Sequence, residues 1–170
     1  CVRTLRFTAP VLQVQFSPSS SRTLLAVLES REAFLVRFPS WEDVQSTTMS
    51  TEPRRIALHG TPDTSAACFT PDGLWILTGS VKGVIRLVNG QDGRLVHDLP
   101  CQIGASMIRE IVLDEQSRHV AVNMNDRTVR TLRVTYNDGC EMPTGLTPTH
   151  KFQDLVSRTP WSGIGFSRGA

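Results

Sequence analysis

The chain has 170 residues, of which 39% are apolar and 20% are charged, and its formal net charge is +2. These values suit one compact domain, or part of one, and they exclude a disordered or collagen-like segment. A charge so near zero argues against an indiscriminate nucleic-acid binder, and no apolar run approaches the ~18 residues that a membrane span requires.

The cysteines and histidines do not show the spacing of a metal site. The four cysteines, Cys1, Cys68, Cys101 and Cys140, lie far apart in sequence without a CxxC pair, and the four histidines are scattered. This arrangement differs from zinc sites and from small disulfide-rich secreted domains. We therefore expect reduced thiols, an intracellular protein, and neither a metal nor another cofactor.

From its N-terminus onward, the chain repeats one order of short apolar runs. An opening run that ends in a turn occurs as VLQVQFSP, SAACFTPDG, IREIVLDEQ and WSGIGFSRG, anchored at Phe16, Phe69, Leu113 and Phe166. The first three are each followed by a second run (TLLAVLE, LWILTGS, HVAVNMN), a third (AFLVRF, GVIRLVN, TVRTLRV) and a fourth (RRIALHG, RLVHDLP, THKFQDL). Such runs, bounded by Gly, Pro, Asp, Asn or Ser, are typical of strands joined by hairpin turns.

Four short antiparallel strands in each repeat of about 40–50 residues are the signature of a β-propeller blade. A lone blade cannot bury both faces of its sheet, and stacking of neighbouring blades explains why the pattern recurs. The predicted fold is therefore all-β, a partial WD-repeat β-propeller with about three four-stranded blades. We expect an internal fragment of one propeller domain with unpaired edges. Its predicted parts are 1–9 (last strand of a preceding blade), 10–60, 61–101 and 102–155 (blades), and 156–170 (first strand of the next blade).

Two turns support this division. In PDG (71–73), Pro71 fixes φ and Gly73 tolerates a positive φ, which predicts a hairpin turn between the first and second strands of the middle blade. The stretch NMNDRTVRTLRV resembles the WD-repeat pattern in which an Asp in the turn after the second strand tethers neighbouring backbone. Asp126 is the matching residue, whereas Lys82 stands there in the preceding repeat, and the Trp-Asp and Gly-His dipeptides of well-formed WD repeats do not occur.

A more particular resemblance covers nearly the whole chain. It is carried by RFTAPVLQVQFSP (6–18), TGSVKGVIRL (78–87), NDRTVRTLRV (125–134) and KFQDLVSRTPWSGIGFS (151–167). These stretches resemble the retinoblastoma-binding protein 5 family, the WD-repeat core subunits of COMPASS and mixed-lineage-leukaemia histone methyltransferase complexes. The resemblance implies a nuclear, non-catalytic scaffold without membrane association. It would help to assemble a SET-domain methyltransferase with the other COMPASS core subunits, for methylation of lysine 4 of histone H3, and would engage the nucleosome.

The resemblance also implies two site residues. Arg127 and Arg158 match family positions that face nucleosomal DNA, and a guanidinium group pairs well with phosphate. Such contacts would position the complex rather than read the DNA sequence. In the alternative interpretation, Arg127 braces the turn beside Asp126, and Arg158 binds a backbone carbonyl near Pro160.

Two other functions remain open at this stage. The chain could belong to a WD-repeat adaptor of another assembly, such as a ubiquitin ligase or a trafficking coat, which would share the fold and lack the DNA-facing arginines. It could also belong to a propeller hydrolase. Because the sequence has neither a GxSxG elbow nor a P-loop, we predict no catalytic residues and no enzymatic activity.

Overall fold

The computed structural model describes residues 4–40, 53–61, 63–136, 142–153, 155–156 and 159–167. This part of the chain contains twelve strands and no helix. The strands are β1 (Val11–Ser17), β2 (Ser20–Leu28), β3 (Ala33–Arg37), β4 (Arg54–Ala57), β5 (Thr64–Phe69), β6 (Trp75–Ser80), β7 (Val84–Asn89), β8 (Leu95–Gln102), β9 (Ile108–Leu113), β10 (His119–Met124), β11 (Thr128–Tyr136) and β12 (Pro143–Gln153).

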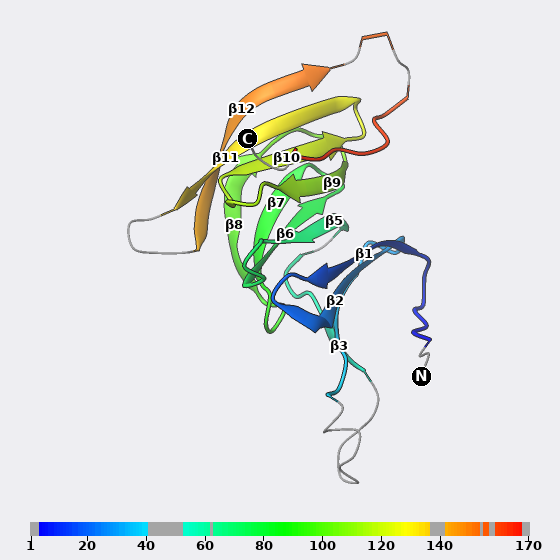
Figure 1. Cartoon of the computed structure of the whole chain (residues 1–170). Helices are drawn as coiled ribbons and strands as arrows, with labels where there is room; N and C mark the ends of the chain where they lie inside the picture. Colours follow the sequence, from blue (N-terminus) through cyan, green and yellow to red (C-terminus); the bar gives the residue numbers. More distant parts are fainter. Residues whose placement is uncertain are drawn as a thin grey trace.

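The strands form three separate four-stranded sheets, each an antiparallel meander of strands consecutive in sequence. The first sheet contains β1 to β4, the second β5 to β8 and the third β9 to β12, and Figure 1 shows them following one another in chain order. This confirms the expected all-β fold and the expected blades of four strands. Residues 4–10 and 159–167 form no strand, and the two partial blades at the ends of the chain stay a prediction.

The hydrophobic core lies between the sheets, which explains why the blades must stack. In β5, Ala66 and Cys68 belong to the cluster shared with the third sheet, whereas Ala67 and Phe69 belong to the cluster shared with the first sheet. Successive side chains of a strand point to opposite faces, and both faces of β5 are covered. Every residue of β5 is buried for this reason, and the sequence reads as an uninterrupted run of small and apolar residues.

The hairpin turn after β5 forms as predicted. Gly73 has a φ of +71°, and its backbone N–H donates to the Thr70 carbonyl at 2.8 Å. The Asp72 carboxylate accepts a hydrogen bond from the Leu74 N–H at 2.9 Å, and this bond also stabilises the turn.

The last strand differs from its expected position. The pattern THKFQDL predicts a strand at 149–155, but β12 begins at Pro143 and ends at Gln153. The reason is that β11 extends to Tyr136, so the two strands pair from Tyr136 and Pro143 onward. β12 is an edge strand, where the missing N–H of a proline is tolerated, so Pro148 does not end it.

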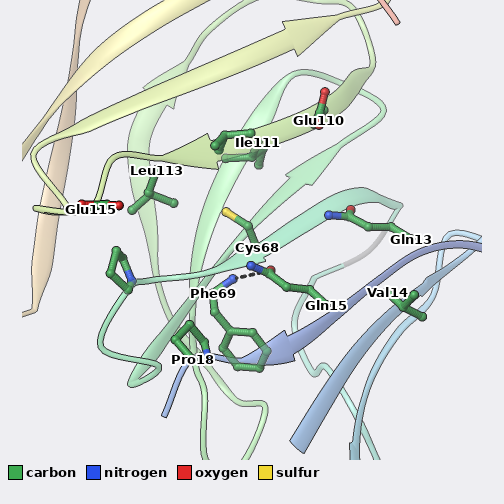
Figure 2. A pocket seen from close by; sticks show the side chains of 12 residues that line it. Gln13, Val14, Gln15, Pro18, Cys68, Phe69, Glu110, Ile111, Leu113 and Glu115 are labelled. Atoms are coloured by element: carbon green, nitrogen blue, oxygen red, sulfur yellow. Dashed lines mark hydrogen bonds between the residues drawn. The ribbon is translucent and has the colours of Figure 1, made fainter. Parts of the chain in front are cut away.

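We call the first strand of each sheet (β1, β5 and β9) its innermost strand. Side chains of these strands form hydrogen bonds with the backbone of the segment that follows in space. The Gln13 and Gln15 side-chain carbonyls accept hydrogen bonds from the backbone N–H groups of Ala67 (3.3 Å) and Phe69 (3.1 Å) in β5. The Gln15 bond is drawn in Figure 2. Ser65 donates its hydroxyl to the Ile108 carbonyl at 2.7 Å. These bonds occupy backbone groups that an unpaired sheet edge would otherwise expose.

The same contact recurs at the third sheet. The Glu110 carboxylate accepts a hydrogen bond from the Ile164 N–H at 3.0 Å, and the Asn123 side-chain N–H₂ donates to the Trp161 carbonyl at 3.0 Å. The segment 159–167 therefore lies along β9 and β10, as the red end of the chain does in Figure 1.

A β-bulge lies near the start of each innermost strand. The pairing register skips Leu12 between Val11 and Gln13, and it skips Ser65 between Thr64 and Ala66. In β9 the partners of Met124 and Asn123 are Ile108 and Glu110, which leaves Arg109 as the extra residue. Bulges redirect the side chain of the extra residue, and these three lie at equivalent positions of the three sheets.

Candidate functional site at the strand-start end

The three sheets share one orientation, so equivalent turns gather at one end. Hydrogen bonds between sheets join residue 13 to 67, 15 to 69 and 65 to 108, which aligns the beginnings of β1, β5 and β9. The turns after β2, β6 and β10 lie at this end, because each sheet is an antiparallel meander. We call the end that carries turns 29–32, 81–83 and 125–127 the strand-start end.

Arg127 occupies the last position of its turn in a left-handed backbone conformation. Its φ is +65°, and the equivalent residues of the first and second sheets, Arg31 and Gly83, have φ values of +68° and +74°. Arg127 is half-buried and has a partner within the structure. The sequence analysis did not identify Arg31 as its counterpart, although its position three residues after the last residue of the second strand, like that of Arg127, was a usable signal.

Asp126 stabilises its own turn. One of its carboxylate oxygens accepts hydrogen bonds from the Thr128 N–H at 3.2 Å and from the Thr128 hydroxyl at 2.6 Å. The other oxygen lies 4.0 Å from a guanidinium nitrogen of Arg130. Asp126 thus fixes the entry into β11 and the placement of Arg127 beside it. The other predicted DNA-contact residue, Arg158, lies outside the described residues.

The charges at the strand-start end are mixed in sign. This end carries arginines and a lysine as well as aspartates and glutamates, and no single-sign field covers it. The cations are Arg31, Lys82, Arg109, Arg127 and Arg130, and the anions are Glu29, Glu32, Asp63, Glu110 and Asp126. Any anion that binds here must therefore be recognised by individual arginines at short range.

A groove of about 660 Å³ runs along the innermost strands (Figure 2). Gln13 and Gln15 line it from β1, Cys68 and Phe69 from β5, and Glu110 from β9. Burial raises the pKa of the Cys68 thiol far above its ordinary value, so this cysteine is a neutral, unreactive part of the core.

Asp114 and His119 form the one contact between an aspartate and a histidine among the described residues, and it belongs to the turn after β9. The carboxylate oxygens of Asp114 accept hydrogen bonds from the Arg118 N–H (2.7 Å) and the His119 N–H (2.9 Å), and one lies 3.2 Å from His119 Nδ1. Burial acts to raise the pKa of Asp114, but these hydrogen bonds outweigh it and lower the pKa below its ordinary value. The pair closes a hairpin.

Within the described ranges no group of three or more His, Cys, Asp and Glu side chains is placed to hold a metal ion. The same residues contain no helix that could cross a membrane.

Comparison with known proteins finds relatives of one kind. No family model matches the chain. The chain is 24% identical to COMPASS component SWD1 of Saccharomyces cerevisiae over 98% of its own length and 39% of that protein. It is 29% identical to the retinoblastoma-binding protein 5 homolog of Drosophila melanogaster over 95% of its own length and 32% of that protein. The chain therefore spans less than half the length of these curated relatives.

A solved structure agrees with this relationship. The β-propeller domain of Cps50 (Swd1) from Myceliophteria thermophila superimposes with a TM-score of 0.73 at 26% identity, over 91% of this chain and 49% of the other. The homologues of this chain are thus Swd1 and retinoblastoma-binding protein 5, and its three sheets are blades of a β-propeller.

Proposed function

We propose that this chain is part of a WD-repeat scaffold subunit of a COMPASS-like complex that methylates lysine 4 of histone H3 in the nucleus. The observation that carries the proposal is the similarity to COMPASS component SWD1 along 98% of the chain, combined with the propeller fold shared with Cps50. The names of these relatives describe a component of an assembly, so the subunit would support assembly and nucleosome engagement and leave methyl transfer to a SET-domain partner.

The arrangement of side chains supports a scaffold. The polar groups of the inner strands accept hydrogen bonds from adjoining backbone, Gln13 and Gln15 from the neighbouring blade and Glu110 from the segment 159–167. The Asp114–His119 pair closes a turn, and the Cys68 thiol is held neutral by burial. The side chains that could take part in catalysis therefore stabilise the propeller instead. Its exposed turns remain accessible to binding partners.

A tagged form of the complete polypeptide that carries this chain tests the proposal. We expect a SET-domain methyltransferase to co-purify with it, and the eluate to methylate histone H3 at lysine 4. Co-purification with the subunits of a ubiquitin ligase or a vesicle coat instead, without this methyltransferase activity, would show that the chain serves another assembly.

Within this function, we propose that Arg127 contacts the phosphates of nucleosomal DNA, with Arg158 as a second contact. Arg127 is supported by its place in a turn at the strand-start end, directly before β11, where Asp126 fixes the backbone beside it. Because phosphates are the same at every base pair, the contact would position the complex without reading sequence.

Replacing Arg127 with Ala should weaken nucleosome binding by the assembled complex about tenfold. It should also make the slope of log K against the logarithm of the salt concentration shallower by about one. Affinity measured at several salt concentrations gives both values. The matched control is Arg118→Ala, which removes an exposed arginine from the opposite end of the same sheet. Equal effects of the two substitutions, or an unchanged salt slope with Arg127→Ala, would rule out the phosphate contact.

A further inference from the structure

A second cavity, of about 490 Å³, opens at the strand-start end, and no part of the proposed function uses it. The three bulge residues, Leu12, Ser65 and Arg109, all line it. We call this cavity the bulge pocket. Its remaining lining residues are Gln13, Glu29, Arg31, Met107, Glu110, Asn123 and Ser162.

Asn123 gives the bulge pocket a buried hydrogen-bond acceptor without a partner. The residue is 1% exposed, its side-chain N–H₂ donates to the Trp161 carbonyl, and its Oδ1 has no hydrogen-bond partner among the described residues. The equivalent residues of the other two sheets are Val27 and Gly79, which carry no polar side chain. An amide is therefore not required at this position by the fold, and an orphaned buried carbonyl calls for a donor.

The lining of the bulge pocket holds two guanidinium groups, of Arg31 and Arg109, and two carboxylates, of Glu29 and Glu110. Neither Arg31 nor Arg109 forms an ion pair or a side-chain hydrogen bond with a described residue. Of the two carboxylates in the lining, that of Glu110 accepts the Ile164 N–H, and Glu29 belongs to an exposed turn. Unpaired arginines beside an orphaned carbonyl fit a ligand that carries both an anionic group and an N–H donor.

We propose that the bulge pocket binds a short acidic peptide segment. A carboxylate of the peptide pairs with Arg109 and Arg31, and a backbone N–H of the peptide donates to Asn123 Oδ1. Duplex DNA fits less well, because its phosphates offer no N–H donor for Asn123 Oδ1. A basic peptide would satisfy Asn123 but would place like charge against both arginines.

Nuclear magnetic resonance titration tests the proposal, since it detects weak binding at individual side chains. The probes are acetyl-Gly-Asp-Gly-amide, the matched acetyl-Gly-Lys-Gly-amide, and inorganic phosphate, each added to the complete polypeptide that carries this chain. We expect saturable shifts of the Arg109 Nε–H and Asn123 side-chain N–H₂ resonances with the aspartyl peptide alone.

Three variants make the result specific. Arg109→Ala and Asn123→Val should each lower the affinity for the aspartyl peptide about tenfold. The first removes a guanidinium group that pairs with the peptide carboxylate, and the second removes the acceptor of the peptide N–H. Valine occupies the equivalent place at Val27, so the fold should tolerate it, which thermal unfolding checks. Arg118→Ala, at the opposite end, should leave the affinity unchanged. Absence of saturable shifts, an equal response to the lysyl peptide or to phosphate, or full affinity in both pocket variants would overturn the proposal.

Discussion

Replacing Gly79 with Val is expected to lower the thermal stability of the propeller sharply, because β6 and the third sheet approach each other closely at Gly79. A Cβ atom at this position would lie 2.6 Å from Ile108 Cγ2 and 2.9 Å from Ile108 Cβ. Ile108 is fully buried in the cluster that joins the two sheets. Overpacking of this kind costs about 3 kcal/mol, which should lower Tm by several degrees.

Calorimetry or circular dichroism of the complete polypeptide measures this change. If Gly79→Val unfolds at the temperature of the parent, the close packing of β6 against β9 is wrong.

The strands could be predicted from the sequence because their burial follows simple rules. β5 is sandwiched between two sheets, so its apolar run is continuous, and the turn residues Pro71 and Gly73 mark where it ends. β12 was placed wrongly because its exposed residues show no strand pattern, and its pairing depends on how far β11 extends. An edge strand held mainly by its neighbour leaves a weak signal in its own sequence.

The candidate sites were less predictable, for a different reason. Arg127 was identified through a family resemblance, whereas Arg31 was missed although it lies equally far beyond its second strand; the positive φ that the two residues share is visible only in the structure. The bulge pocket could not be foreseen either. A bulge is a property of pairing between two strands, so Leu12, Ser65 and Arg109 look unrelated in sequence although the fold places them at one end.

The turn position shared by Arg31, Gly83 and Arg127 leads to the second large effect, that of Gly83→Ala. Arginine is accepted twice at this φ, so the conformation alone does not require glycine. In the middle blade, however, the Gly83 carbonyl accepts a hydrogen bond from the Ile103 N–H, and the chain between β8 and β9 passes so close that a Cβ atom would overlap the Gly104 carbonyl oxygen.

Gly83→Ala should therefore cost about 3 kcal/mol, the sum of the left-handed penalty of about 1–2 kcal/mol and the displacement of backbone that no rotamer change relieves. Arg31→Gly is the matched control, because it relaxes the same φ in a blade where arginine is already accommodated, and it should be neutral or stabilise by up to about 1 kcal/mol. Urea unfolding gives the free energy of unfolding of each variant, and an unchanged m-value shows that the two can be compared. A loss of only about 1–2 kcal/mol with Gly83→Ala, the size of the left-handed penalty alone, would mean that the contact between the second blade and the β8–β9 connection contributes little.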